Sequence, residues 1–480
     1  MNDKYQRLIK NSGIFMIANF GSKFFSFILV PFYTHVLSTG EYGTVDALVA
    51  TVSLFSPIAT LGIGDVIIMF LSKKEYEAKK IFANATALII AGNILVSLVY
   101  PLLFLSEIFR QYLIYFIVLV AASSVYGVLQ MYARGTNKVA SCAISGVVYT
   151  VTLALSNIWF LLLVKIGIPG YLMSTVLAYL VPSIYLFIVV RDKSFNLALL
   201  DKKLMNNILK LSIPLIPTAI LWTLMNLADK YAILWAVGSS GNGIYAVAHK
   251  IPTIISVIYG IFQQAWQLTT FELDSQKERS TAYSKIFELL TSVMFVLAAV
   301  LIVLNRIYII CFCDASYIMA WTVSPILMYS AVLNCISGLL GSNYLIMHDT
   351  RSALKVTAVG AVINVILNFV LVPLWGLYGA AIATCIGYLY MVIKKYYDTS
   401  KFTPLNIRIS RFLLANVTLI LMCCSVVVRS AGMFYVFNIV LGLGMMALYK
   451  EQFHNVADLI LNKIYKRKQN ESWHNYDGKR

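Results

Sequence analysis

The chain has 480 residues; 60% are hydrophobic, 12% are charged, and the formal net charge is +17. Soluble domains carry roughly a quarter charged residues, so this composition excludes an ordinary soluble protein. Long apolar runs recur from Ser12 almost to Lys450, and that pattern is typical of a polytopic helical membrane protein.

Apolar runs of about 17 to 30 residues predict fourteen transmembrane helices in an all-α fold. In chain order they cover 12–37, 44–71, 81–105, 111–133, 141–164, 170–190, 208–237, 244–271, 286–304, 320–347, 353–373, 376–396, 410–428 and 432–449. The first run is too long for the core of a cleavable signal peptide, so we expect it to be retained as the first helix. The alternating segments of about ten residues that build an outer-membrane barrel are missing from the sequence.

The basic residues are distributed unevenly between the two predicted faces of the membrane. With the N-terminus placed in the cytoplasm, the cytoplasmic segments, counted together with the span ends next to them, hold 31 Lys and Arg residues, and the outer loops hold 4. The other 3 lie within predicted spans and are Lys23, Lys230 and Lys250. This bias is the positive-inside signal and predicts that both termini are cytoplasmic. The basicity therefore reports topology and does not indicate a nucleic-acid-binding protein.

An internal repeat is visible in the sequence. Two stretches 209 residues apart, GIPGYLMSTVLAY (167–179) and GLYGAAIATCIGY (376–388), share the spacing G-x-x-G-x-x-x-x-T-x-x-x-Y. A second match, at a separation of 200 residues, aligns Lys10, Ser12 and Gly43 with Lys210, Ser212 and Gly243. Helices one to six therefore resemble helices seven to twelve, with two more helices appended. Because six is even, the two repeats are parallel, and such repeats enclose a central cavity in transporters.

The repeat divides the chain into five predicted parts. They are an N-terminal six-helix lobe (1–190), a cytoplasmic linker (191–209), a C-terminal six-helix lobe (210–396), two additional helices (397–450) and a basic cytoplasmic tail (451–480). No extramembrane segment is long enough to form a separate domain. An enzyme acting at the outer face would need a sizeable loop for its site, so we expect a transporter and no enzyme.

Several charged residues are predicted at bilayer depth, where each costs roughly 2.5 to 3.5 kcal/mol and therefore faces a cavity or a partner. Lys23 lies near the middle of the first predicted helix, too deep for its side chain to reach either interface. Asp229 and Lys230 precede the turn between helices seven and eight. His249 and Lys250 follow that turn at a similar distance, so all four residues share a depth of about 10 to 14 Å.

Two interpretations of these charges are open. Asp229 and Lys230 are helix neighbours about 100° apart and cannot simply neutralise each other. In the first interpretation a structural ion pair between Asp229 and Lys250 fixes the hairpin. In the second, Lys23, Lys230 and Lys250 form a cationic wall that attracts an anionic substrate. We favour the second because three deep lysines face one comparably deep carboxylate, and we expect Lys230 to face the cavity while Asp229 holds Lys250.

Other polar residues are secondary candidates. Asn226 lies one turn from Asp229 and extends its polar face, and Asp65 lies close to the predicted inner interface. Together with Asp229 and His249 they are candidates for ion coupling or for a structural pair. Asp46 and His35 flank the first outer turn and are expected at the membrane interface.

The sequence shows no catalytic constellation. The five His residues lack metal-ligand spacing, and no P-loop or defensible Ser/His/Asp arrangement occurs. The 7 Cys residues lie mostly in or beside predicted spans as small hydrophobic residues. We therefore predict no catalytic residues, no metal and no cofactor, and any uphill transport must draw on an ion or substrate gradient.

The segment SIPLIPTAILWTLMNLADKYAILWAVGSSGNGIYAVAHKIPTI (212–254) resembles helices seven and eight of bacterial polysaccharide flippases. These are the O-antigen (Wzx-type) and capsule-repeat transporters of the multidrug/oligosaccharidyl-lipid/polysaccharide (MOP) exporter superfamily. The resemblance is carried by Pro214, Pro217, Asp229 with a basic neighbour, Gly243-Ile-Tyr245 and Lys250. The segment 21–46 resembles the first hairpin of that family. The family often has Arg where Lys230 stands, and Lys binds phosphate as a point charge without the bidentate fork of Arg.

This resemblance implies a MATE-like fold and a flippase working by alternating access. Its implied substrate is an oligosaccharide repeat unit linked through pyrophosphate to undecaprenol, moved to the outer leaflet of the bacterial inner membrane for O-antigen, lipopolysaccharide or capsule synthesis. The implied partners are this lipid-linked substrate, the bilayer, a polysaccharide polymerase and a chain-length regulator. An opposing H⁺ or Na⁺, bound at Asp229 or Asp65, could reset the carrier.

Three alternatives stay open. A flippase for teichoic-acid or peptidoglycan precursors would have the same fold and an equally anionic substrate. A cation-coupled multidrug exporter of that fold should have an anionic cavity. A membrane glycosyltransferase or ligase should have a large outer loop with catalytic residues, and none is visible.

Overall fold

The computed structural model describes residues 27–73, 75–103, 106–190, 199–270, 276–347, 349–427, 430–452 and 454. Throughout these ranges the secondary structure is helical, without a strand. Ten of the described helices are long and apolar enough to cross a membrane, or eleven if the bent pair Ser239–Lys250 and Pro252–Gln263 is one span. The prediction of an all-α, multi-pass membrane protein is confirmed.

The remaining three predicted spans each contain a shorter apolar helix. These helices are Phe27–Val36, Ile409–Cys424 and Gly432–Leu448. They lie at the first, thirteenth and fourteenth predicted positions. Residues 12–26 of the first span fall outside the described ranges, and so do Lys10, Ser12 and Lys23.

The N-terminal lobe is formed by the helices α2 to α8. They are α2 (Thr39–Ala59), α3 (Ile63–Lys73), α4 (Ala78–Ser97), α5 (Tyr100–Leu103), α6 (Glu107–Gly135), α7 (Val139–Asn157) with a π-helical turn over Ile158–Leu163, and α8 (Gly167–Val190). The predicted span 44–71 is broken into α2 and α3, because Leu61 and Gly62 adopt positive φ angles of 49° and 64° that no α-helix accommodates.

The next helix, α9 (Lys202–Ser212), belongs structurally to this lobe. Its apolar side chains Leu204 and Ile208 are buried with residues of α3, α4, α6 and α8. Asp201 caps the helix by accepting hydrogen bonds from the backbone of Lys203 and Leu204. The described part of the predicted linker 191–209 is therefore mostly an amphipathic helix rather than an open connection.

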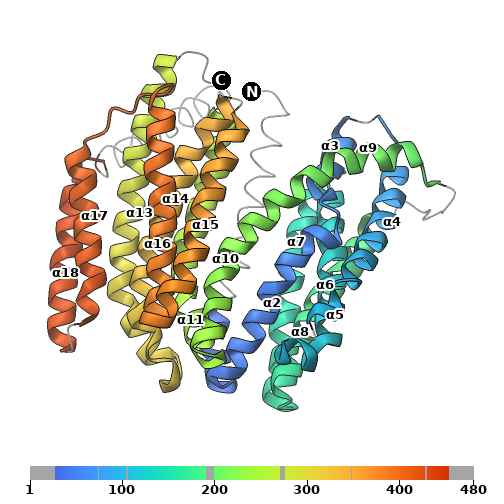
Figure 1. Cartoon of the computed structure of the whole chain (residues 1–480), viewed down its shortest axis with the longest axis horizontal. Helices are drawn as coiled ribbons and strands as arrows, with labels where there is room; N and C mark the ends of the chain where they lie inside the picture. Colours follow the sequence, from blue (N-terminus) through green and yellow to red (C-terminus); the bar gives the residue numbers. More distant parts are fainter. Residues whose placement is uncertain are drawn as a thin grey trace, which may run out of the picture.

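The C-terminal lobe and the appended helices follow. They are α10 (Ile216–Ala236), α11 (Ser239–Lys250), α12 (Pro252–Thr270), α13 (Gln276–Phe312), α14 (Ala320–Ile346), α15 (Thr350–Trp375), α16 (Leu377–Ser400), α17 (Ile409–Cys424) and α18 (Ala431–Leu448). Figure 1 shows the two lobes side by side with α10 crossing between them. The lobes converge where α2 meets α11 and diverge toward the end that carries α9. We call these the α2–α11 end and the α9 end.

The repeat is visible in the backbone geometry. Gly167 and Gly376, which the sequence aligns, both adopt φ of +55°, and each stands where α8 or α16 begins. Glycine is suited to such angles because it lacks a Cβ. Gly43 and Gly243, which the sequence also aligns, contact each other directly between the two lobes. A Cβ on Gly43 would lie 2.6 Å from the backbone nitrogen of Gly243, so only glycine lets α2 and α11 approach so closely.

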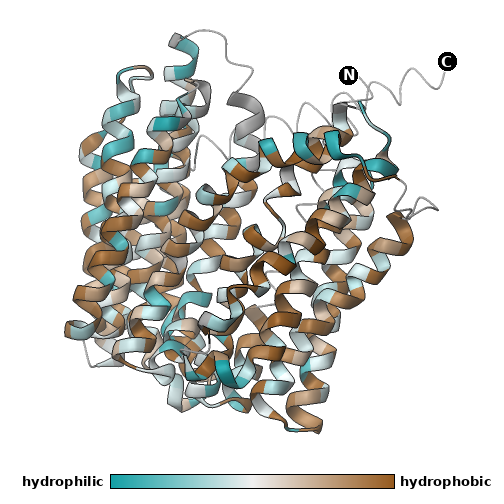
Figure 2. Ribbon diagram, turned by 45° about the vertical axis from the view of Figure 1, so that its right-hand side comes forward, coloured by the Kyte–Doolittle hydropathy of each residue, from teal (hydrophilic) through white to brown (hydrophobic). Residues whose placement is uncertain are grey.

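The surface agrees with a membrane environment. Figure 2 shows hydrophobic residues along the sides of the helices and hydrophilic residues gathered toward the α9 end. In the isolated chain, without lipid, large apolar residues such as Leu98, Ile114 and Leu374 are more than 60% exposed. Such exposure is expected where lipid takes the place of water.

Candidate functional site

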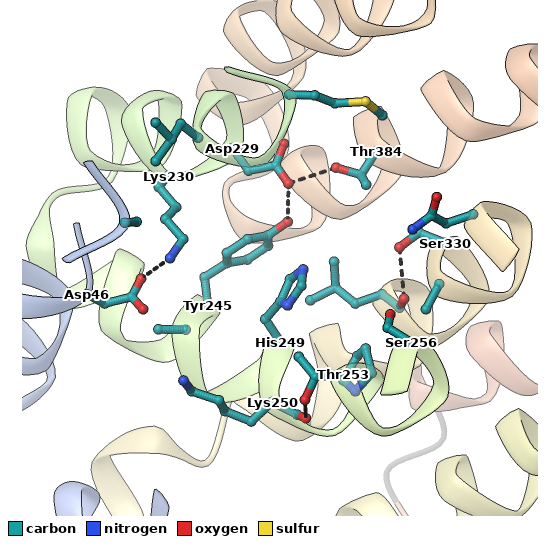
Figure 3. Close-up of a pocket in the computed structure, with 18 of the residues that line it drawn as sticks. Asp46, Asp229, Lys230, Tyr245, His249, Lys250, Thr253, Ser256, Ser330 and Thr384 are labelled. Carbon is teal, nitrogen blue, oxygen red and sulfur yellow. Dashed lines mark hydrogen bonds and ion pairs between the residues drawn. The ribbon is translucent and has the colours of Figure 1, made fainter. Parts of the chain in front are cut away.

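A cavity of about 350 Å³ lies between the two lobes. The N-terminal lobe contributes three residues of α2 to its wall, namely Asp46, Ala50 and Ser53. The rest of the lining comes from α10, α11, α12, α14 and α16. Figure 3 shows the polar side chains of this wall converging from several helices. A cavity between the lobes is the place where the repeat predicts a transport site.

Lys230 lines this cavity and joins the two lobes. Its Nζ lies 2.5 Å from Oδ2 of Asp46, and both side chains are mostly buried, with 21% and 15% exposed (Figure 3). A second polar contact lies nearby, where Thr51 and Tyr231 share a hydrogen bond of 2.7 Å. Asp46 was expected to flank the first outer turn at the membrane interface, and the structure places its side chain in the wall of the cavity. Its side chain points inward because α2 already begins at Thr39 and presents Asp46 two turns inside the helix.

Asp229 points away from Lys230, into the C-terminal lobe, and is 5% exposed. Its carboxylate accepts hydrogen bonds from Tyr245 Oη at 2.8 Å, Thr384 Oγ1 at 2.8 Å and Asn368 Nδ2 at 2.6 Å, with Asn364 Nδ2 at 3.5 Å. All four donors are neutral, so the ion pair expected with Lys250 is replaced by a network of hydrogen bonds. The 100° between helix neighbours thus separates the two charges, as predicted.

His249 and Lys250 line the same cavity from the end of α11. The chain bends there by 44° between α11 and α12, which begins at Pro252. The predicted span 244–271 is therefore a broken helix, because a proline ring cannot join the hydrogen bonding of the preceding turn. Broken helices at membrane depth occur where they line a cavity.

The structure thus brings together four of the predicted residues and leaves three untested. Lys230, Lys250, Asp229 and His249 all line the cavity, and Lys230 faces it as predicted. Lys23 and the side chains of Asp65 and Asn226 lie outside the described part.

The charge balance of the cavity differs from the expected cationic excess. Among its described lining residues, the two lysines Lys230 and Lys250 are matched by the two carboxylates Asp46 and Asp229. Asp46 is the carboxylate that the sequence interpretation left out. Any net attraction of this wall for an anion therefore depends on whether Asp46 stays paired with Lys230.

Sequence reasoning missed most partners of Asp229. Asn364 and Asn368 lie four residues apart in α15, hence on one helix face, and both are fully buried. That spacing within an apolar run could have indicated an inward polar stripe. Thr384 was seen only as part of the repeat, yet it supplies one of the hydrogen bonds to Asp229. Among the residues that the structure describes, its counterpart Thr175 bonds only the carbonyl of Tyr171 within its own helix.

The chain is similar in sequence to one family of proteins over more than half of its length. A model of the family described as "Polysaccharide biosynthesis protein" matches residues 8–267, more than half of the 480 residues. The chain belongs to this polysaccharide biosynthesis protein family. A curated relative, an uncharacterized membrane protein of Methanocaldococcus jannaschii, is 25% identical over 418 residues, covering 79% of this chain and 94% of the relative.

Solved structures of transporters share the fold of this family member. The lipid II flippase MurJ in an inward closed conformation gives a TM-score of 0.71 at 15% identity, covering 93% of this chain and 99% of MurJ. An inward-facing MATE family multidrug transporter of the MOP superfamily gives 0.60 at 14% identity, covering 80% and 97%. An outward-facing MATE family multidrug transporter of the MOP superfamily gives a TM-score of 0.57 at 15% identity, covering 84% of this chain and 96% of that transporter. The fold is that of the MOP superfamily.

Proposed function

We propose that this chain is a flippase that moves undecaprenyl-pyrophosphate-linked oligosaccharide repeat units from the cytoplasmic to the outer leaflet by alternating access. Family membership supports a role in polysaccharide synthesis, and the MOP fold supports a transporter rather than an enzyme. O-antigen, capsule or lipopolysaccharide synthesis is the proposed pathway. The proposed setting is a bacterial inner membrane with both termini in the cytoplasm, beside a polysaccharide polymerase and a chain-length regulator.

The observation that carries this proposal is the ion pair between Lys230 and Asp46 in the wall of the central cavity. The pair joins one residue of each lobe, and both side chains remain partly accessible to the cavity. A pyrophosphate carries more negative charge than one carboxylate and can take the place of Asp46 at Lys230. Lys250 lies in the same wall and adds a second cation. Binding of the headgroup would then loosen the contact between the lobes, which alternating access requires.

The membrane potential favours the proposed direction of transport. Moving one negative charge out of a cell with a negative interior gains about 2.3 kcal/mol per 100 mV. The lipid tail stays in the bilayer and adds no charge. The role of the cavity is therefore to provide polar contacts for the headgroup in place of the water that hydrates it outside the membrane.

We further propose that Asp229 is the site that couples transport to H⁺ or Na⁺. Besides the carboxylate, the side-chain oxygens of Asn364 and Asn368 are buried there and accept no hydrogen bond from the described residues. A buried oxygen without a donor costs about 1 to 3 kcal/mol, and a bound cation would remove that cost. If the two amides turn their oxygens toward Asp229, then carboxylate, amide and hydroxyl oxygens from three helices form a ligand set suited to a hard cation such as Na⁺. Protonation of Asp229 is the alternative form of coupling.

A multidrug exporter is the second candidate, because two carboxylates, Asp46 and Asp229, line the same cavity. Cationic drugs would require at least one of them to be accessible. Asp46 is held by Lys230 and Asp229 by four neutral donors, so neither is available without rearrangement. This observation favours the anionic substrate.

The proposal is tested by disrupting the gene and complementing the strain with variants. Wild type and Lys394→Gln, which alters an exposed lysine outside the cavity, should restore surface polysaccharide. Lys230→Gln combined with Lys250→Gln should not, although its level in the membrane stays normal. Surface polysaccharide that is intact in the disrupted strain, together with a gain in drug sensitivity, would favour the exporter instead.

A further inference from the structure

A second, larger cavity lies within the C-terminal lobe, toward the α9 end. Its volume is about 870 Å³, and residues of α10, α12, α14, α15 and α16 line it. It shares Ser256 and Asn334 with the central cavity, so the two cavities meet at these residues. We call it the inner cavity. The inner cavity thus extends from the central cavity toward the α9 end of this lobe.

The charge of the inner cavity is one-sided. Arg351 and Lys395 line it, and no carboxylate occurs among its described lining residues. The central cavity, in contrast, holds equal numbers of lysines and carboxylates. The excess of positive charge that the sequence predicts for a substrate wall is therefore found here.

Lys395 is the more unusual of the two cations because only 5% of it is exposed. Its Nζ donates to Ser337 Oγ at 2.9 Å and to the Ser337 carbonyl at 3.1 Å, and the described residues place no carboxylate within ion-pair distance of it. Gly341 lets this ammonium pack close to the backbone of α14, since a Cβ there would lie only 3.2 Å from Nζ. A buried ammonium is costly unless it is paired, so this position calls for an anion.

The neighbouring residue Lys394, unlike Lys395, has a carboxylate partner on the same helix. Lys394 pairs with Asp398 at 2.8 Å on the exposed side of α16. The second oxygen of Asp398 accepts from Tyr344 at 3.0 Å. The only nearby carboxylate on this helix is thus directed away from Lys395, which faces the inner cavity.

The inner cavity lies closer to the α9 end of the molecule than the central cavity does. Lys395 lies five residues before the end of α16 at Ser400, so it is about 7 to 8 Å from the α9 end of that helix. Arg351 stands in the first turn of α15 at the same end. Both cations therefore lie nearer the predicted cytoplasmic face than the central cavity does.

We propose that Lys395 and Arg351 form a second anion-binding site that receives the pyrophosphate of the lipid-linked substrate before it reaches Lys230. This inference rests on the proposed flippase function and adds a binding step to it. Phosphate groups are the ligand class, because the Lys395 ammonium, which already contacts the Ser337 hydroxyl, and the Arg351 guanidinium in the same cavity wall are donors that match the charge and acceptor oxygens of phosphate. Anionic phospholipid offers the same chemistry and is the alternative source.

The test is equilibrium binding to the full-length protein in nanodiscs of phosphatidylcholine, with radiolabelled undecaprenyl pyrophosphate as the probe and undecaprenol as the uncharged comparison. Lys395→Gln and Arg351→Gln should each weaken binding of the pyrophosphate at least tenfold, while Lys394→Gln leaves it unchanged. Arg351 is exposed, so its variant reports on the site even if Lys395→Gln fails to assemble. Thermal unfolding of each variant checks that the fold is retained.

Three outcomes would overturn the inference. If wild type binds the pyrophosphate and both cavity variants bind it equally well, the inner cavity is not a binding site, although the flippase proposal stands. If wild type does not bind the pyrophosphate at all, both proposals fail. If phosphatidylglycerol in the discs competes with the same dependence on Lys395, the site takes phospholipid headgroups in general and the assignment to the substrate is wrong.

Discussion

Lys230 and Asp46 connect the two repeats across the central cavity, one from α10 and the other from α2, at 2.5 Å. An anionic headgroup must compete with Asp46 for the same ammonium. Asp46→Asn removes the competitor, so it should raise the affinity for undecaprenyl pyrophosphate by about tenfold, the change that about 1.4 kcal/mol gives.

The binding assay in nanodiscs measures this change directly. Lys230→Gln in the Asp46→Asn background should return the affinity to or below that of wild type. Weaker binding by Asp46→Asn alone would show that Asp46 supports the anion rather than competing with it.

Closure of the α2–α11 end depends on Gly43 and Gly243. Gly43→Ala places a Cβ against the backbone of Ser239 and Gly243, which cannot yield as a flexible side chain would. We expect this variant to be displaced toward a state open at that end and to lose most transport. A cysteine introduced at Ala50, in the wall of the central cavity, should then react faster with a membrane-impermeant thiol reagent added from outside.

The matched control is Gly127→Ala in α6, where a Cβ meets nothing within 4 Å. It should behave as wild type or be slightly more stable, since alanine favours helices by up to about 1 kcal/mol. Wild-type labelling and transport in Gly43→Ala would refute the role of this contact.

Sodium or proton coupling at Asp229 predicts an ion-dependent stability. If Na⁺ binds there, replacing choline with Na⁺ at constant ionic strength should stabilise the purified protein, by about 2.7 kcal/mol at a hundred times the dissociation constant. Asp229→Asn and Thr384→Val should abolish this stabilisation. Thr175→Val, at the equivalent position of the other repeat, should keep it.

A stabilisation by Na⁺ that survives Asp229→Asn would place the cation elsewhere. If Na⁺ has no effect on wild type while transport responds to a pH gradient only when Asp229 is present, the coupling ion is the proton.

The backbone angle at Gly376 gives a test of the repeat geometry. Its φ is +55°, and a Cβ there would meet no atom within 4 Å, so Gly376→Ala isolates the conformational cost. That cost is about 1 to 3 kcal/mol, and it should lower the unfolding temperature in detergent. Gly146→Ala, also without a neighbour within 4 Å but inside α7, should not lower it. Equal unfolding temperatures for the two variants would contradict the strained turn before α16.

Composition and the length of the apolar runs were sufficient to predict the helical membrane fold. Apolar runs must be helical in lipid, so their positions on the chain translate directly into spans. The repeat was visible because glycine is the residue that suits the turns at Gly167 and Gly376 and the crossing at Gly43 and Gly243. Breaks within spans, at Leu61-Gly62 and before Pro252, were not predicted, because the spans were assigned from the lengths of the apolar runs and not from backbone geometry.

The site was predicted only in part. The depth of Asp229, Lys230, His249 and Lys250 followed from the rise of a helix, and all four line one cavity. Their partners did not follow, because Asp46 comes from the other repeat and Asn364, Asn368 and Thr384 come from α15 and α16. Lys395 was not among the predicted site residues, because its burial depends on the packing of α14 against α16. Contacts between distant segments are what a single sequence does not specify.

The proposed function requires that Lys230 in the central cavity binds the anionic lipid headgroup during transport. The most direct measurement is translocation of a fluorescent oligosaccharide linked through pyrophosphate to a polyprenol in proteoliposomes, with quenching of the outer leaflet as the readout. We expect translocation by wild type and Lys394→Gln, and at least a tenfold lower rate for Lys230→Gln. A wild-type rate for Lys230→Gln would contradict that requirement.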